Sequence, residues 1–366
     1  RAILSRHDDW DTLHSTADKI DGLCNIGRQF LDGGDWANAG RIYQAIADEG
    51  LSQYPNIYDD DGIISSALAE AVAGLSDAFA AAPPDAPERG ELIQALYQCF
   101  EFDNSFFGGT GITDYTAEAL VEFTTPEEQA LIKARLLETL NVLKDDPKEQ
   151  EDLLGRPDWR FRATGRLLLE LDEQAGDAEG FLKHARDYRQ HLLLAVKLLD
   201  LGRLNEALEV AHAHLRQPWD CMQAANALRE AGHVEEAIRL VDDLYWETSD
   251  HRLSAWLAEA YRETDPTAAF KIQREQFKDR PTLELFRDIQ ALAPPDEWPA
   301  ARAELVALVE EKQWWELLVQ IHMEERDWDQ AWDAASKLTG WAVDRVLERL
   351  ADASAPDQPE RAINAY

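Results

Sequence analysis

The side chains of this chain that could do chemistry include three cysteines, nine histidines and 71 carboxylates. Cys24, Cys99 and Cys221 are scattered and odd in number, which argues against a disulfide framework and against a zinc knuckle built on cysteine. None of them stands in a recognisable nucleophile motif. The carboxylates are too numerous for any pair to be marked as a general acid and its base. We therefore expect no catalytic residue and no cofactor, and we expect the thiols to be buried and reduced.

The histidines do not group in the way that a metal site requires. On a helix, His212 and His214 would point about 200° apart, so they could not easily share one ion. His184 and His191 could share a helix face, but no third ligand is evident. The sequence therefore predicts no metal site, and we expect these histidines at the surface or between helices.

A glycine-rich stretch at residues 108–111 suggests a phosphate loop at first sight. It reads Gly-Gly-Thr-Gly, but no lysine follows it to meet a phosphate, and no strand precedes it. We expect an aromatic loop over residues 102–114 that packs Phe102, Phe106 and Phe107 between helices.

An acidic run, Asp59-Asp60-Asp61, precedes Gly62. Consecutive acids lack the alternating spacing of a calcium loop. Carboxylates favour helix N-termini, so this run is expected to cap a helix that begins near Ile63.

Tryptophan is the residue type with functional weight, because it is enriched where protein partners dock. Nine of the twelve lie between residues 219 and 341. Trp328 and Trp332 would share one helix face, and of the adjacent Trp314 and Trp315 at least one should point away from the core. We name four candidate partner-binding residues: Trp314, Trp315, Trp328 and Trp332. The alternative interpretation is that these rings fill space between helix layers.

The charge balance limits the partners. With 36 basic and 71 acidic residues, the formal net charge is −35. Such a surface repels phosphate backbones and anionic lipids, so we expect no direct nucleic-acid binding and no membrane binding. No apolar run approaches the length of a membrane span, and no secretory leader is recognised. We expect a cytoplasmic protein.

The hydrophobic pattern is helical nearly throughout, with apolar residues recurring at steps of three and four. Residues 192–215 and 222–245 repeat one pattern: a helix, a glycine (Gly202 or Gly232), a polar turn, and a second helix that begins with Glu-Ala. The small alanine of the second helix recurs along the chain: Ala39, Ala207, Ala237, Ala268 and Ala331. A hairpin of this length cannot bury its own apolar face, so hairpins stack. We predict an all-α fold, an α-solenoid of TPR-like helix-turn-helix repeats.

The loops divide this array. A charged stretch at 144–158 suggests an N-terminal helical region over 1–147, containing the loop at 102–114, and a repeat solenoid over 148–350. Residues 351–366 lose the helical period, and we expect an irregular tail there.

Residues 56–140 carry a family resemblance. The acidic-Gly helix start at Asp59 to Gly62 and the aromatic loop from Phe102 to Gly108 resemble the helical region that follows the zinc finger in bacterial SWIM zinc-finger proteins. The Cys-x-Cys and Cys-x-His zinc motif of that family is absent here. The resemblance implies either a finger upstream of Arg1 or a relative without one. It also implies partnership with nucleic-acid-linked machinery.

These observations favour a non-enzymatic interaction module or scaffold that binds a basic protein or peptide. Two alternatives stay open. One is an α/α-toroid carbohydrate-active enzyme, which is also helical, acidic and rich in tryptophan. The other is an adaptor for nucleic-acid-linked machinery.

Overall fold

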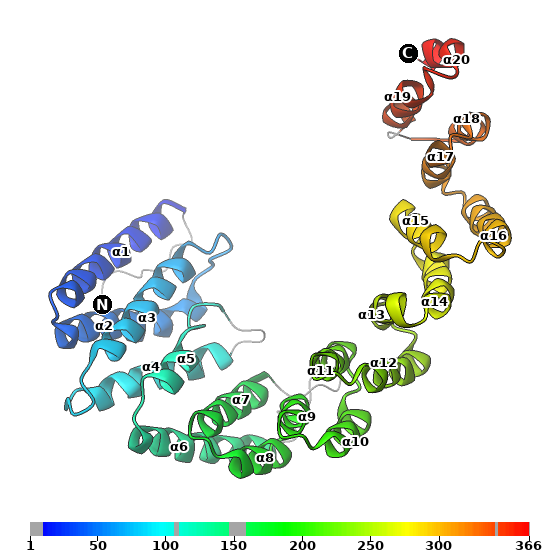
Figure 1. Ribbon diagram of the computed structural model, residues 1–366. Coiled ribbons are helices and arrows are strands. Elements are labelled where there is room, and N and C mark those ends of the chain that lie inside the picture. Colours follow the sequence, from blue (N-terminus) through cyan, green and yellow to red (C-terminus); the bar gives the residue numbers. More distant parts are fainter. Residues whose placement is uncertain (1–9, 106–109, 146–158, 341–342, 366) are drawn as a thin grey trace. The chain divides into compact units, whose positions relative to one another are not determined.

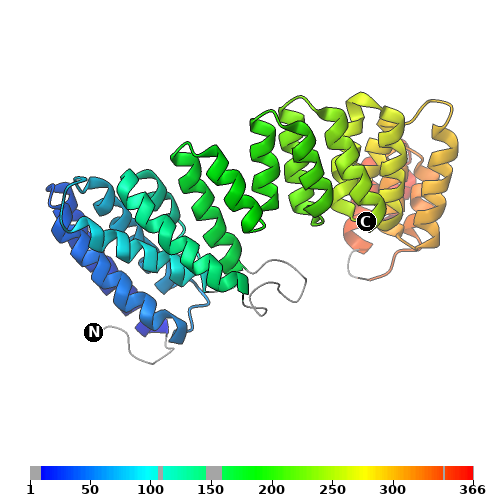
Figure 2. The ribbon, with the colours of Figure 1, turned by 90° about the horizontal axis from the view of Figure 1, so that it is seen from below.

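The computed structural model describes residues 10–105, 110–145, 159–340 and 343–365. These residues form α-helices, α1 to α20, and one 3-10 turn, η1, with no strand among them. The chain divides into two compact units, Arg1–Leu194 (unit 1) and Ala195–Tyr366 (unit 2). Within each unit most consecutive helices pack against each other and run side by side (Figures 1 and 2). The predicted all-α solenoid of helix-turn-helix repeats is confirmed.

The elements of unit 1 are α1 (Trp10–Asp32), α2 (Trp36–Gln53), η1 (Tyr54–Asn56), α3 (Ile63–Ala81), α4 (Arg89–Asn104), α5 (Thr116–Glu122), α6 (Pro126–Asp145), α7 (Trp159–Gln174) and α8 (Ala178–Asp187). The division between the units falls inside α9 (His191–Asp200). The elements of unit 2 that follow are α10 (Leu204–His214), α11 (Pro218–Glu230), α12 (Val234–Thr248), α13 (His251–Thr264), α14 (Pro266–Asp279), α15 (Leu283–Leu292), α16 (Trp298–Glu311), α17 (Trp315–Glu324), α18 (Trp328–Ala335), α19 (Val343–Ser354) and α20 (Pro359–Ala365).

Many of the helical hairpins close through one type of turn. Gly202 and Gly232 adopt φ of 72° and 88°, in the left-handed region that glycine enters without strain. The next residue donates its N–H to the carbonyl five residues back, from Arg203 to Leu198 and from His233 to Leu228, each at 2.8 Å. This is the Schellman motif, and its last residue is also the N-cap of the next helix.

The same turn occurs where the sequence has no glycine. Arg189, Gln313 and Arg326 have φ of 54° to 57°, and the matching backbone hydrogen bonds follow each of them. The hairpin α17–α18 is therefore closed by the same geometry as α9–α10, although its turn carries Arg326 instead of glycine. The repeat is more regular in the backbone than in the residue types.

In the hairpins where the sequence predicts a small alanine, this residue is expected early in the second helix, and the buried alanine lies four positions after the N-cap. Ala39, Ala207, Ala237 and Ala331 are buried there, as predicted. In α14 the prediction was wrong by one residue: the N-cap is Asp265, so the buried alanine is Ala269, while Ala268 is half-buried.

The core of unit 1 is centred on Tyr43 of α2. Its ring is buried, and its hydroxyl donates to the Cys24 carbonyl at 3.1 Å. Gly27 of α1 and Gly74 of α3 contact this ring so closely that a Cβ on Gly74 would lie 2.3 Å from two ring atoms. The two glycines therefore admit the tyrosine between α1 and α3.

The acidic run before α3 caps that helix, as predicted. The Asp59 carboxylate accepts the backbone N–H groups of Ile64 at 3.1 Å and Ser65 at 2.8 Å. By length and composition α3 could cross a membrane, which the sequence analysis did not expect. In unit 1, however, 56% of its apolar window is buried, because α3 lies in the core.

Some features of the predicted domain division lie on residues that the structure does not describe. The boundary between residues 147 and 148 lies outside the described residues, as do Phe106 and Phe107 of the aromatic loop. Phe102 packs against the core, and the centroid of its ring lies 6.4 Å from that of the Tyr54 ring. Helices α7 and α8, which were expected in the repeat array, belong to unit 1, because apolar residues of α7 join its core.

The prediction of an irregular tail over 351–366 was wrong for the residues that are described. Residues 351–354 complete α19, and α20 follows. Leu350, Ala351 and Ala362 are buried, and Arg361 pairs with Asp329 of α18 at 2.8 Å. Packing against α18 thus supplies the order that the local sequence pattern does not.

Candidate binding cleft

A cleft of about 640 Å³ opens in unit 1 between the end of α4, the loop before α5, α5 itself and α7. These segments are up to about 70 residues apart in the chain, and the packing of α7 against α4 and α5 brings them together. The floor is apolar and includes Phe100, Val121 and Leu167. Such a floor offers contact area to the aliphatic part of a ligand.

The rim of the cleft is acidic. Its charged lining residues are Asp103, Asp114, Glu118, Glu122, Arg166 and Glu170. Five carboxylates and one guanidinium leave four negative charges uncompensated. The one guanidinium is already engaged, because Arg166 Nε lies 2.9 Å from the Glu170 carboxylate. The Asp103 carboxylate is also occupied, since it accepts the backbone N–H of Thr110 at 2.7 Å.

Buried polar groups lie among these lining residues. The Thr116 hydroxyl donates to the Thr113 carbonyl at 2.7 Å, which satisfies it. Asn104 is only 8% exposed, and its Nδ2 has no hydrogen-bond partner among the described residues. An enclosed amide donor without an acceptor costs about 1–3 kcal/mol, and because this nitrogen is enclosed it is not a contact point for a ligand in the cleft.

Trp159, the first residue of α7, adds an aromatic ring to the lining and is 42% exposed. The sequence analysis named neither Trp159 nor the other lining residues as a site. The available signal was the stretch at 102–114, which fits the repeat pattern least. Nothing in the sequence indicates that α7 would pack beside it.

The four tryptophans named from the sequence lie in one hairpin of unit 2, α17–α18. All four are half-buried and pack against the second hydrophobic core. Trp314 is the N-cap of α17, the Trp315 ring lies 5.0 Å from the Lys337 ammonium, and the Trp328 indole donates to Asp357 at 2.7 Å. The more exposed tryptophans are elsewhere: Trp219 is 62% exposed and Trp246 is 77% exposed. Partner binding by the named four stays a prediction.

The other chemistry-bearing side chains are structural in their surroundings. Cys24, Cys99 and Cys221 are free and buried, and burial raises the pKa of each thiol to about 12. His184 Nδ1 lies 2.7 Å from the buried Asp172 carboxylate, which Lys133 also contacts at 3.0 Å. Within the described ranges, no three His, Cys, Asp or Glu side chains are grouped so that they could hold a metal ion.

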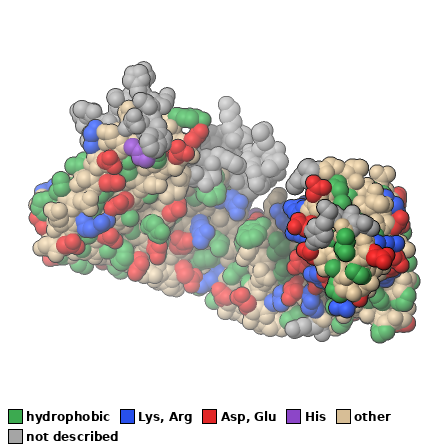
Figure 3. Space-filling view, turned by 90° about the horizontal axis from the view of Figure 1, so that it is seen from above, with side chains coloured by type: hydrophobic (Ala, Val, Ile, Leu, Met, Phe, Trp, Pro, Cys, Tyr) green, Lys and Arg blue, Asp and Glu red, His purple; other side chains and the backbone are tan. Residues whose placement is uncertain are grey.

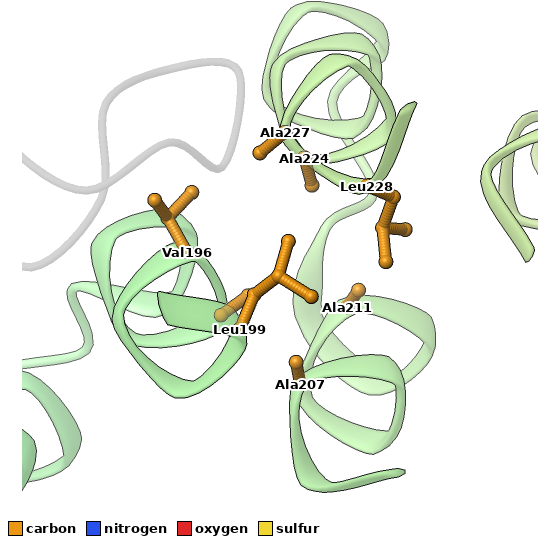
Figure 4. Close-up of a pocket in the computed structure, with 8 residues that line it drawn as sticks. Val196, Leu199, Ala207, Ala211, Ala224, Ala227 and Leu228 are labelled. Carbon is orange, nitrogen blue, oxygen red and sulfur yellow. The ribbon is translucent and has the colours of Figure 1, made fainter. Parts of the chain in front are cut away.

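A second cavity lies in unit 2 between α9, α10 and α11 (Figure 4). Only apolar side chains line it, among them Val196, Leu199 and Leu228, and its volume of about 10 Å³ admits no more than one water-sized probe. It is a gap between helices rather than a ligand site.

Comparison with known proteins places the chain in no family. No family model matches it, and no curated protein matches it. Among solved structures, a circular tandem repeat protein with novel repeat topology and enhanced subunit contact surfaces is similar at 17% identity, covering 98% of this chain and 90% of that chain with a TM-score of 0.25. The resemblance of residues 56–140 to SWIM zinc-finger proteins stays a prediction.

Proposed function

We propose that the chain is a non-enzymatic helical-repeat scaffold that binds a basic protein partner, with the cleft of unit 1 as a contact site. One observation carries the proposal: four uncompensated negative charges surround an open apolar floor. A basic partner would place its cations at the rim and its apolar stems on the floor.

The rest of the surface supports the same class of partner. Asp and Glu side chains are spread over the face of the molecule in Figure 3. Many of the scarcer arginines are engaged in ion pairs with carboxylates far along the chain, such as Arg216 with Glu247 and Arg28 with Glu70, each at 2.7 Å. The net charge of −35 would speed encounters with cationic proteins more than it would deepen final affinity.

Salt dependence tests this proposal. The association rate of fluorescein-labelled poly-lysine with the full chain should fall at least about tenfold between about 0.05 and 0.5 M NaCl, because screening shortens the reach of the field. Labelled poly-glutamate serves as the control and should not bind. An association rate that salt leaves unchanged would contradict the proposal.

The enzyme alternative can be tested at the same cleft, because Trp159 and several carboxylates line it together, as aromatic rings and acids do in sugar-binding clefts. A panel of soluble glycans, with reducing ends assayed, should show no turnover by the full chain. Hydrolysis that is lost in Glu118→Gln or Glu122→Gln would overturn the scaffold proposal.

A further inference from the structure

We propose that unit 1 binds a second copy of this chain through α1, with the two α1 helices antiparallel across a twofold axis at Ile26. This inference goes beyond the proposed function, because neither the cleft nor a basic partner takes part in the contact. In such a dimer both copies use the same surface, so that surface must be complementary to itself.

One face of α1 carries apolar side chains that the fold of unit 1 leaves exposed. The helix packs against α2 and α3, and its opposite side, which carries Cys24, lies in the core. Leu23, Ile26 and Phe30 are 36%, 44% and 37% exposed. Steps of three and four residues place these three side chains on one stripe of the helix. Figure 1 shows α1 at the edge of unit 1, where a second molecule can reach it.

The stripe fits itself in shape. Gly22 is exposed within α1, and a Cβ there would meet no atom within 4 Å, so no described neighbour requires a glycine. A glycine inside a helix nevertheless costs about 0.5–1 kcal/mol relative to alanine. Gly22 and Phe30 lie four residues before and four residues after Ile26. In an antiparallel pair centred on Ile26, the Phe30 ring of each copy therefore lies over Gly22 of the other, where the missing side chain leaves room.

The stripe also fits itself in charge. Lys19 is exposed one turn before Leu23 on the same face, and it is seven residues from Ile26. In the antiparallel pair it lies level with the end of α1, whose last residue is Asp32. That end has no basic residue in its last turn, and a cation is favoured there by the helix dipole and by the Asp32 carboxylate. A parallel pair would instead bring Lys19 beside Lys19, so charge selects the antiparallel arrangement.

The strength of the contact follows from its size and from the net charge. Three side chains per copy are less than the area of a standard interface, so the dissociation constant should be on the order of 10–100 µM. Two copies of net charge −35 repel each other. Raising NaCl from about 0.05 to 0.5 M should therefore tighten the dimer several-fold, because salt screens that repulsion.

Sedimentation of the full chain over about 1–300 µM measures the monomer–dimer equilibrium. Ile26→Glu places two carboxylates on the twofold axis and should weaken the dimer at least about tenfold. The matched control is Leu131→Glu in α6, a side chain that is 74% exposed. It adds the same charge at another position of unit 1 and should weaken the dimer by less than about twofold.

Gly22→Gln tests the shape argument without risk to folding. The new side chain occupies the space that the Phe30 ring of the second copy needs, so the dimer should weaken about tenfold. The variant should melt at or above the temperature of the parent chain, because glutamine forms helices better than glycine.

A charge exchange tests the antiparallel arrangement. Lys19→Glu should weaken the dimer about fivefold, since the pair with Asp32 occurs twice. Its control, Lys312→Glu at an exposed position of unit 2, changes the net charge equally and should have less than about a twofold effect. Lys19→Glu combined with Asp32→Lys should return the dissociation constant to within about twofold of the parent value.

The outcomes separate this inference from the proposed function. A chain that stays monomeric to about 300 µM, equal weakening by Ile26→Glu and Leu131→Glu, or a dimer that salt dissociates would overturn the α1 contact. No recovery in the double variant would overturn the antiparallel arrangement. Each of these results leaves the scaffold proposal in place, because poly-lysine binding is measured separately and responds to salt in the opposite direction.

Discussion

Glycine has two tasks in unit 1 of this protein and one task in the described part of unit 2. In unit 1, Gly27 and Gly74 lie inside helices, where the missing side chain admits the Tyr43 ring. In unit 2, Gly202 and Gly232 lie in turns with positive φ, and a Cβ on either would meet no atom within 4 Å. Unit 1 also has the repeated turn, at Gly34, Gly176 and Arg189, and adds contacts that occur once, whereas the glycines described in unit 2 serve turns alone. Substitutions should therefore have large effects at particular positions of unit 1 and small effects at many positions of unit 2.

The largest expected effect is at Arg89, a buried cation of unit 1. Its guanidinium donates to the carbonyls of Phe79, Ala82 and Phe123 and pairs with Glu128 at 2.8 Å. Arg89→Met leaves these acceptors unpaired, and we expect a loss of about 3–5 kcal/mol in unfolding free energy. Urea unfolding measures the loss, and hydrogen exchange assigns it to unit 1.

The matched control for this prediction is Arg216→Met in unit 2. Arg216 pairs with Glu247 at 2.7 Å, but both side chains are exposed, so the loss should be below about 1 kcal/mol. Equal losses in the two variants would break the contrast between the units.

A methyl group at Gly74 should give the next largest effect. The Cβ of Gly74→Ala would lie 2.3 Å from two atoms of the Tyr43 ring, which its hydroxyl and Gly27 hold in place. We expect a loss of about 1–3 kcal/mol, measured by urea unfolding. Gly22→Ala in α1 meets no atom within 4 Å and should instead gain up to about 1 kcal/mol. A neutral Gly74→Ala would show that the α1–α3 contact is loose.

Acid should weaken unit 2 through His322. This residue is buried, and its Nδ1 has no hydrogen-bond partner among the described residues. Burial lowers the pKa of His322 below its ordinary value near 6.5, although the nearby carboxylates of Glu325, Asp327 and Glu310 oppose the shift. On acidification the unfolded chain takes up the proton first, so the stabilisation is complete above pH about 6.5 and is lost as the pH falls below it.

The measurement for His322 is unfolding free energy against pH in the parent chain and in His322→Gln. The decline between pH about 7 and 5 should be shallower in the variant, because glutamine does not titrate in that range. Identical slopes would mean that other groups set the acid sensitivity.

The smallest effects belong to the repeated turn. Gly232→Ala should lose about 1 kcal/mol, because alanine is strained at a φ of 88°. Arg326→Gly should gain about 0.5 kcal/mol, since Arg326 already holds φ of 56° at the equivalent turn position. Thermal unfolding of both variants measures these shifts. A destabilising Arg326→Gly would show that this arginine supports its turn through its side chain.

The sequence predicted the turns of the repeat well and the C-terminal helices poorly. Glycines in the turns and alanines four residues after the N-caps follow from local backbone sterics, so the repeat could be recognised from the sequence. The turns at Gln313 and Arg326 were not recognised, because these residue types disfavour the positive φ that they adopt there. The helices beyond residue 350 were missed because their order depends on packing: Val346 and Leu350 of α19 belong to the second hydrophobic core, and Arg361 of α20 pairs with Asp329 of α18.

The sequence indicated only one of the segments that line the cleft. The unusual stretch at 102–114 is visible in the sequence, but Trp159 and Arg166 lie on α7, far from it along the chain. Hydrophobic periodicity states which face of a helix is buried and does not state which other helix covers it. Asn104 looked like any polar residue at a helix end until packing enclosed its amide.

The amino-acid sequence by itself determined the helices, their turns and the excess of negative charge, because periodicity, capping and ionisation are properties of neighbouring residues. The tertiary structure decided which carboxylates share a cleft, which tryptophans face solvent and which glycines admit a ring. Those outcomes depend on contacts between helices that are far apart in the chain, and they form only when the helices pack.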